Sequence, residues 1–351
     1  MTHKSPHHHT HDVSTQEEGM RLDRWLRLRY QGVPYVYFAK LCRQGLIRID
    51  GRKVDGSVRI KTGQSILLKK QPQKHDTQKQ PSPPYSLAPA LKAQLRRAIL
   101  YQDDDIIALN KKAGIATQGG TGVRWHIDGA LSLFAPSDSE NKPKLVHRLD
   151  QGTSGVLLIA RHHKSAVALA SMFREQTIEK TYWALCAGRV TGDKGRMETP
   201  IPYKERRPPH KTIGKDACTL YRHVRGQSAH CTWLILRPLS GRTHQIRQHC
   251  AWLGHPLLGD KKFGRRQKQE ILSSKQPLKH PLKHLCLHAR SMRFSHPMTS
   301  KKITITAEIP SLMKNIIEDT CGISEAYWRR IEEESDVVLR HLAYHINSKN
   351  M

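Results

Sequence analysis

The chain has 351 residues, more than one hydrophobic core usually holds, so we expect two domains with flanking tails. Lys and Arg number 59 against 30 Asp and Glu, and the formal net charge of +29 attracts polyanions. No stretch approaches the roughly 18 apolar residues of a membrane-spanning helix, and the polar N-terminus lacks the apolar segment of a secretion signal. Composition therefore argues against a membrane protein and predicts a cytoplasmic protein whose partner is nucleic acid.

The first part of the chain changes from a polar tail to an amphipathic pattern. Residues 1–19 are rich in histidine and show no helical or strand periodicity, which predicts a disordered leader. In the following RLDRWLRLRY, apolar side chains project to one side of a helix and arginines to another. A second helix, YVYFAKLCRQ, is expected next, and the Asp-Gly pair in LIRIDGRKV predicts a tight hairpin turn.

Two small basic helices, a hairpin and a further strand make a unit over residues 20–70 that resembles the S4 RNA-binding domain. The resemblance implies that basic side chains of both helices meet RNA phosphates: Arg21, Arg24, Lys40 and Arg43. Taken singly, each of these could equally be an ordinary solvated helix residue. As a cluster beside the hairpin, they favour RNA binding.

The rest of the chain predicts a linker, a large domain and a helical end. Residues 71–95 are rich in Gln, Lys and Pro and lack an apolar period, which predicts an extended linker. Residues 96–310 alternate strand-like runs with helical stretches, an order typical of an α+β domain with a mixed, largely antiparallel sheet. Residues 311–351 predict a C-terminal helical extension.

Three patterns suggest other chemistries, and each fails on its spacing. GTSG has glycine directly after serine, whereas a nucleophile elbow needs G-x-S-x-G, and GGTG lacks the Gly-Lys-Ser/Thr ending of a phosphate-binding loop. His280, His284 and His288 would share one helical face as metal ligands. The flanking proline and the alternating LCLHA predict a strand instead, which would spread them apart. We therefore expect no metal site.

The segment around Asp150, KLVHRLDQGTSGVLLIA, contains the strongest signal in the chain. A lone aspartate in a loop is most often a cap or turn residue, so spacing alone does not single it out. However, HRLDQGTSGVLLIA closely resembles the H-R-L-D-x-x-T-S-G signature of the RluA-type pseudouridine synthases. Two further blocks follow in the family's order, FREQTIEKTYWALCAG and LSGRTHQIRQHCAWLGHPLLGD, and the resemblance covers nearly all of residues 100–310. Lys112 and Gln118 depart from the family pattern, which affects loop shape or substrate fit rather than chemistry.

The resemblance implies a reaction without a cofactor and a set of site residues. The family isomerises uridine in RNA: the N1–C1′ bond breaks, the uracil turns, and C5 is joined to C1′. Asp150 would be the carboxylate that adds to C1′ or removes a proton from C2′. Arg148 would enter the space that the flipped base leaves, Tyr182 would stack on the base, and Arg242 would pair with Asp150. Four further polar residues would orient the loop or touch RNA: His147, His244, Gln245 and Arg247.

An S4 unit ahead of the catalytic domain is typical of the family members that act on large-subunit rRNA, so the resemblance implies large-subunit (23S) rRNA, free or in an assembling particle, as the substrate. The sequence of the unit looks most similar to the RluC branch. We expect a monomer that binds RNA. An inactive assembly factor of the same fold would share the charge and the S4-like unit, but would have no use for Asp150, Tyr182 and Arg242 together. A glycoside hydrolase would need a second carboxylate near the first, and Asp260 is expected only to fix a turn.

Overall fold

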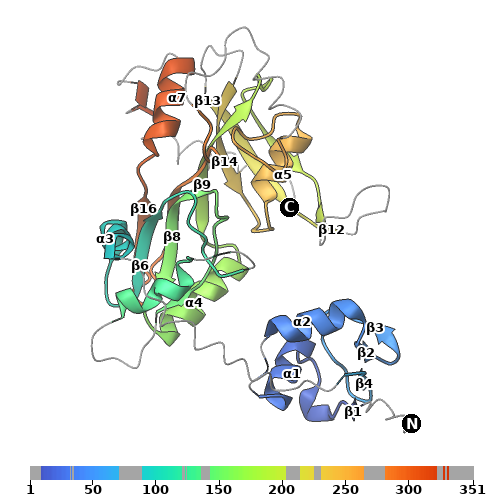
Figure 1. The fold of residues 1–351 in the computed structure, drawn as a ribbon. Coiled ribbons are helices and arrows are strands. Elements are labelled where there is room, and N and C mark those ends of the chain that lie inside the picture. Colours follow the sequence, from blue (N-terminus) through green and yellow to red (C-terminus); the bar gives the residue numbers. More distant parts are fainter. Residues whose placement is uncertain are drawn as a thin grey trace, which may run out of the picture. The chain divides into compact units, whose positions relative to one another are not determined.

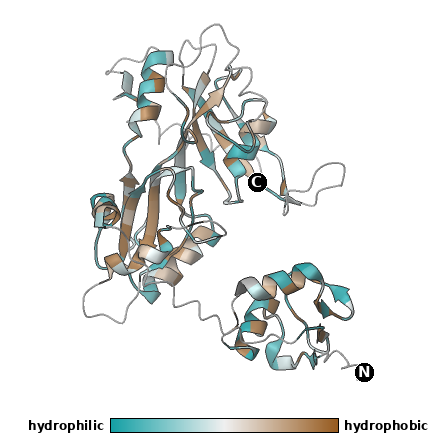
Figure 2. Cartoon of the chain, in the orientation of Figure 1, coloured by the Kyte–Doolittle hydropathy of each residue, from teal (hydrophilic) through white to brown (hydrophobic). Residues whose placement is uncertain are grey.

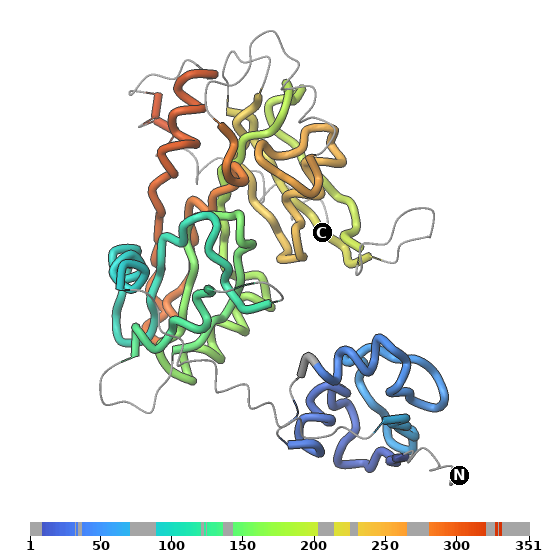
Figure 3. Tube along the Cα trace, in the orientation of Figure 1, coloured from blue at the N-terminus to red at the C-terminus, as the bar shows by residue number. Residues whose placement is uncertain are grey.

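The structure, a computed structural model, contains two compact units, Met1–Pro84 and Tyr85–Met351 (Figure 1, Figure 3). It describes residues 9–31, 33, 35–70, 89–120, 123, 125–135, 143–202, 214–224, 231–264, 281–321, 327, 328, 330 and 331. Among them, no helix has the length and apolar character needed to cross a membrane. The predicted α+β class, with a small first unit and a larger one on a mixed sheet, is confirmed.

The first unit packs two helices on a four-stranded antiparallel sheet. The helices are α1 (Leu22–Arg29) and α2 (Tyr35–Gln44). The strands, in the order β1-β4-β2-β3, are β1 (His9–Asp12), β4 (Ser65–Leu68), β2 (Ile47–Ile49) and β3 (Arg52–Lys53). Trp25 and Leu26 of α1 are buried in the core, while the arginines on its other side are exposed, as the periodicity predicts. In the turn from β2 to β3, Asp50 and Gly51 have φ of 47° and 73°, the left-handed conformation that a tight hairpin needs.

The predicted disordered leader is wrong for residues 9–19, which belong to this first unit. His9–Asp12 form β1, the edge strand that pairs with β4. Val13 is only 3% exposed, and a short 3-10 helix, Thr15–Glu17, leads into α1. A strand of four residues is too short for its alternation to stand out in a histidine-rich segment, and its pairing with β4 depends on distant residues.

The second unit is built on a ten-stranded sheet. Eight strands follow the order β10-β13-β14-β9-β15-β8-β6-β5, with β16 paired to β15 and β7 to β8. Neighbours run antiparallel except β8 and β15, which pair in parallel over two residues. The strands are β5 (Ile99–Gln102), β6 (Ile106–Lys111), β7 (Lys144–Leu145), β8 (Ser154–Ala160), β9 (Glu179–Ala187), β10 (Lys194–Glu198), β13 (Cys218–Val224), β14 (Cys231–Pro238), β15 (Leu287–Ser295) and β16 (Lys302–Thr306). Two more strands, β11 (Ile201–Pro202) and β12 (Gly214–Lys215), form a separate small sheet.

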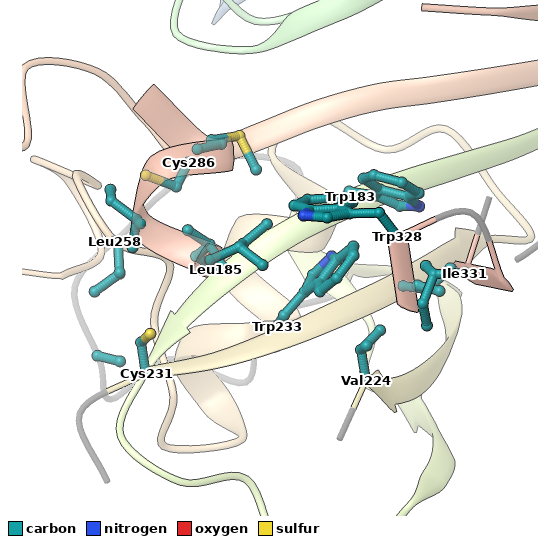
Figure 4. Packing of buried hydrophobic residues seen from close by; sticks show 14 of the residues in the cluster. Trp183, Leu185, Val224, Cys231, Trp233, Leu258, Cys286, Trp328 and Ile331 are labelled. Carbon is teal, nitrogen blue, oxygen red and sulfur yellow. The ribbon is translucent and has the colours of Figure 1, made fainter. Parts of the chain in front are cut away.

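Helices cover both faces of the half of the sheet that contains β9 and β14. On one face of β9 and β14, Trp183 and Trp233 pack with ring centroids 4.9 Å apart, and Trp328 lies against both (Figure 4). Helix α7 (Ser311–Cys321) joins that cluster, with Ile316 fully buried. On the other face, helix α5 (Gln245–Trp252) packs on the alternate side chains of the same strands.

The predicted C-terminal extension is therefore part of the large domain as far as the structure describes it. Residues 311–321 and Trp328 and Ile331 complete the core on one face of the sheet. Residues 322–326, 329 and 332–351, the remainder of that predicted extension, lie outside the described residues. The periodicity of the sequence predicts the helix α7, but only the sheet that α7 covers makes it part of the domain.

The other half of the sheet is sandwiched in the same manner. Strands β6 and β8 are buried on both faces, and Figure 2 colours them as mainly hydrophobic. One face packs against α3 (Pro89–Arg97) and a 3-10 helix (Asp128–Phe134), and the other packs against α4 (His163–Arg174). Residues 89–95, assigned to the linker by their composition, form most of α3, in which Leu95 is 4% exposed. The rest of the predicted linker, residues 71–88, lies outside the described residues.

A buried histidine fixes the start of β8 to β15. Nδ1 of His288 lies 2.9 Å from Oγ of Ser154, and its Nε2 lies 3.2 Å from the carbonyl oxygen of Ala307. Because the carbonyl can only accept, Nε2 carries the proton and Nδ1 accepts from the serine hydroxyl. Burial lowers the pKa of His288 to about 4, and the charge of Arg290 contributes to the shift. The ring is therefore neutral in the folded protein.

We expect this histidine to make stability fall in acid. Below pH 6.5 the unfolded chain takes up a proton at this position, whereas the folded ring stays neutral down to about pH 4. The free energy of unfolding should therefore fall with decreasing pH across this window, by up to about 1.4 kcal/mol per pH unit from this group. Denaturant unfolding of wild type and His288→Gln between pH 7 and pH 5 measures it. The variant should show a shallower pH dependence, and equal slopes would contradict the role of His288.

Candidate active site

A cavity of about 290 Å³ lies where three segments of the second unit meet. They are the loop before β8, the first residues of β9, and the turn that leads from β14 into α5. The four side chains predicted from separate sequence blocks all line it: Arg148, Asp150, Tyr182 and Arg242. The fold thus brings together residues that are up to about a hundred positions apart, and Asp150 is the one carboxylate among the lining residues.

The loop that carries Asp150 is clamped by the segment that follows β6. The hydroxyl of Thr117 donates to the carbonyl of Leu149 at 2.7 Å and accepts from its N–H at 3.1 Å. Lys111, which is 2% exposed, donates from Nζ to carbonyls of the turn after β6 and lies 3.5 Å from the carbonyl of Gln151. Burial lowers the pKa of Lys111 to about 7, while the charge of Asp150 acts in the opposite direction. These contacts fix the backbone on both sides of Asp150.

Arg247 is the arginine that contacts Asp150 among the described residues. Its Nη1 lies 3.3 Å from Oδ2 of Asp150. The other side of the guanidinium makes two hydrogen bonds to Asp260, 2.8 Å from Nε to Oδ2 and 2.9 Å from Nη2 to Oδ1. Such a two-point contact fixes the plane of the guanidinium, and therefore the direction from which it meets Asp150. Nε2 of His244 lies 3.8 Å from the same carboxylate oxygen.

Asp260 does more than fix the turn that the sequence predicted. Its side chain is fully buried, and Oδ1 accepts from the backbone N–H groups of Lys262 and Phe263, as a turn residue would. Burial alone would raise the pKa of Asp260, but the hydrogen bonds from Arg247 and from the two amides outweigh it and lower that pKa. Asp260, Arg247 and Asp150 thus form a chain of alternating charges.

The predicted pairing of Arg242 with Asp150 is corrected by this geometry. Arg242 lines the cavity, but its Nε lies 3.3 Å from the carbonyl oxygen of Asp216, to which it donates. It stands in the turn before α5, whereas Arg247 is on the helix itself. The two arginines share one sequence block, and only the start and phase of α5 decide which of them reaches Asp150.

The turn into α5 is fixed by Gln245. Its Oε1 accepts from the hydroxyl of Ser240 at 2.7 Å and from the N–H of Arg242 at 3.1 Å. Its Nε2 donates to β13, at the carbonyl of Cys218 and the hydroxyl of Thr219. With a 4% exposed side chain, Gln245 acts as an internal brace of this turn.

His147 also has a structural position in the loop before β8. Its Nε2 accepts from the N–H of Leu158 at 2.8 Å, and its ring stacks on Phe173 with centroids 4.5 Å apart. Burial lowers the pKa of His147 to about 3, helped by the charge of Lys180. A neutral ring at physiological pH suits a residue that holds the loop.

Tyr182 lies on β9, and its side chain packs against the apolar clusters beside the cavity. Burial raises the pKa of Tyr182 far above its usual range, and the charge of Asp150 raises it further. The phenol is therefore protonated at physiological pH. A neutral aromatic ring at the wall of the cavity can stack on a planar base.

A second cluster of ionisable groups lies elsewhere in this unit. Asp103, Asp105 and His296 place ligand atoms within 4.8 Å of one another. However, Nδ1 of His296 accepts from the N–H of Thr299 at 3.1 Å, so Nε2 carries a proton and donates to Asp103 at 3.0 Å. Asp103 also accepts from the hydroxyl of Tyr101 at 2.6 Å. We therefore assign this cluster a structural role.

The four predicted RNA-binding residues are all exposed: Arg24 lies on α1, Lys40 and Arg43 lie on α2, and Arg21 is the N-cap residue just before α1. Arg21 pairs with Asp23 at 2.5 Å, and Nε of Arg43 donates to a carbonyl of its own helix. Arg21 and Arg24 line a hollow of about 360 Å³ together with Arg59, which the sequence did not single out because it lies in a loop. RNA contact by these side chains remains a prediction.

Comparisons with known proteins define the class of this fold. Human RNA pseudouridylate synthase domain containing 4 shares it with a TM-score of 0.54 and 24% identity, over 65% of this chain and 95% of that one. The family described as RNA pseudouridylate synthase matches residues 105–252, which include Asp150, Tyr182 and Arg247.

Curated relatives extend over most of the chain. Ribosomal large subunit pseudouridine synthase C of Rickettsia bellii (strain RML369-C) is 32% identical over 308 residues, 84% of this chain and 96% of that protein. The protein of the same name from Vibrio vulnificus (strain CMCP6) is 29% identical over 313 residues, 88% of this chain and 95% of that one. The chain therefore belongs to the RluA-type family of RNA pseudouridine synthases.

Proposed function

We propose that this protein isomerises specific uridines to pseudouridine in large-subunit (23S) rRNA, with Asp150 as the catalytic carboxylate. The observation that carries the proposal is the single carboxylate of the cavity, 3.3 Å from Arg247, which Asp260 holds in turn. The relatives named ribosomal large subunit pseudouridine synthase C support the choice of RNA, since the similarity extends beyond the second unit into the first.

The cavity offers each group that the isomerisation needs. Asp150 can add to C1′ or take the proton from C2′ while the N1–C1′ bond breaks. Tyr182 provides a flat apolar surface for the released uracil. Arg148 is exposed in the same loop as Asp150, where its side chain could fill the space that a flipped nucleotide leaves in the RNA stack. Arg247 fixes the direction of the carboxylate, which keeps the reacting atoms in line.

Chemical mapping of pseudouridine tests the proposal. Large-subunit rRNA transcript, and a precursor particle that carries it, are incubated with the wild-type protein, treated with a carbodiimide and read by primer extension. We expect a new stop at one or a few uridines. If the protein binds both RNAs without producing a stop, the inactive assembly factor becomes the better explanation, and small-subunit rRNA and tRNA test a different substrate.

We expect the basic residues of the first unit to set the salt dependence of RNA binding. Each phosphate contact releases counterions and contributes about 0.7 to 0.9 to the slope of log K against log salt. Changing Arg21, Arg24, Lys40 and Arg43 together to Gln should flatten that slope by about 3. A charge-matched control changes exposed lysines of the second unit: Lys194, Lys301, Lys302 and Lys314. Equal slopes for both variants would show that these four residues do not contact RNA phosphates.

A further inference from the structure

Lys180 is a cation of the cavity that none of the roles above uses. It lies on β9 two residues before Tyr182, so both side chains project from the same face of the strand. Both line the cavity that contains Asp150, and Phe173 and Pro238 line it as well. Ala184, the next residue on the same face, is buried in an apolar cluster. Lys180 and Tyr182 therefore lie where this buried face of β9 reaches the cavity.

The ammonium of Lys180 has no counterion in the part of the chain that the structure describes. No carboxylate there lies within ion-pair distance of it, and it forms no hydrogen bond with a described residue. The cations near it are paired: Arg237 pairs with Glu179 at 3.1 Å, and Arg247, which lines the same cavity, pairs with Asp150 and Asp260. Burial lowers the pKa of Lys180 to about 8, and the charge of Arg237 adds to this effect.

A half-buried cation with no partner among the described residues costs free energy in the empty protein, and a negative charge beside it would offset that cost. The reaction proposed above produces such a charge. When N1–C1′ breaks, its electron pair stays on the uracil and spreads over N1, O2 and O4. Tyr182, which would stack on that ring, is the cavity-facing neighbour of Lys180 on β9.

We propose that Lys180 donates a hydrogen bond from its ammonium to a carbonyl oxygen of the uracil and stabilises the uracil anion while it is detached from the ribose. This inference rests on the proposed function. Lys180 transfers no proton: Asp150 bonds to C1′ or takes the C2′ proton. The uracil then forms the C5–C1′ bond with its own electron pair while the Asp150–C1′ bond breaks in the first case, or while Asp150 returns the proton to C2′ in the second. Loss of the C5 proton and protonation of N1 complete the isomerisation. A cation fixed at the wall of the cavity is well suited to a charge that develops only during the reaction.

Single-turnover kinetics on a mapped RNA substrate test the proposal with three variants. Lys180→Met keeps the aliphatic length and removes the charge, Lys180→Arg keeps the charge, and Lys314→Met on α7 is the matched control. We expect Lys180→Met to slow the isomerisation about 10²-fold with little change in the Kd for RNA. Lys180→Arg should recover a large part of that loss, and Lys314→Met should equal wild type.

A second substrate separates stabilisation of the anion from a structural role. Fluorine at C5 withdraws electrons, so the anion of 5-fluorouracil depends less on the protein. The rate at which the N-glycoside is consumed in RNA with 5-fluorouridine should fall much less in Lys180→Met than the rate with uridine. Equal losses on both substrates, or a loss confined to the Kd, would overturn the proposal.

The pH dependence gives an independent readout. Lys180 is charged below its pKa and neutral above it, so kcat/KM of wild type should decline as the pH rises through about 8. Lys180→Arg, whose guanidinium stays charged, should lack that decline. If wild type forms pseudouridine and Lys180→Met is as fast, only this inference fails. If wild type modifies none of the RNAs tested, the proposed function fails first.

Discussion

Replacing Asp150 by Asn is expected to abolish pseudouridine formation while leaving RNA affinity within a few-fold of wild type. The amide has the shape of the carboxylate, but it cannot add to C1′ as a nucleophile or take the proton from C2′. We expect the single-turnover rate to fall by about 10⁴-fold or more. Binding should persist because we expect phosphate contacts elsewhere on the protein to supply most of the affinity for RNA.

Asp104→Asn is the matched control for this experiment. Asp104 is fully exposed in the turn before β6, in the same unit, and its only described ion pair is a 3.9 Å contact to Arg161. This variant should keep the wild-type rate. Measuring the melting temperature of both variants separates chemistry from folding. Pseudouridine formed by Asp150→Asn at a rate near wild type would refute the role of the carboxylate.

Replacing Arg247 by Met is expected to cost both activity and stability, and more of each than replacing Arg242 by Met. Without the guanidinium, Asp150 loses its 3.3 Å contact and Asp260 keeps a fully buried carboxylate without its cation. Loss of a positioned charged donor costs about 10² to 10³-fold in rate, and breaking a buried ion pair costs about 3 kcal/mol in the free energy of unfolding.

Arg242→Met tests the alternative that the sequence favoured. Arg242 donates to a backbone carbonyl at the cavity wall, so its loss should weaken substrate binding more than the rate of the bound complex. Rate and Kd measured for both variants decide between them. If Arg242→Met were the slower enzyme at saturating RNA and Arg247→Met nearly normal, the order of the two arginines proposed here would be reversed.

The sequence by itself determined the class, the two-unit organisation and the segment that carries the site. Local patterns were sufficient for α1, α2, the Asp50-Gly51 hairpin and the alternation of strands and helices, because periodicity and turn chemistry act over a few residues. The signature around Asp150 was equally local, and its resemblance named a family that the comparisons establish.

Tertiary structure decided what depends on residues far apart in the chain. Strand β1 exists because β4 supplies its hydrogen bonds, and α7 belongs to the domain because its apolar face covers the tryptophans of β9 and β14. Arg247 rather than Arg242 reaches Asp150 because of where α5 begins, and Asp260 becomes its support only once the chain after α5 folds back. Lys180 differs from the other cations near the cavity because no described carboxylate lies within ion-pair distance of it. Which charges pair across neighbouring strands depends on the fold, and residue spacing in the sequence does not reveal it.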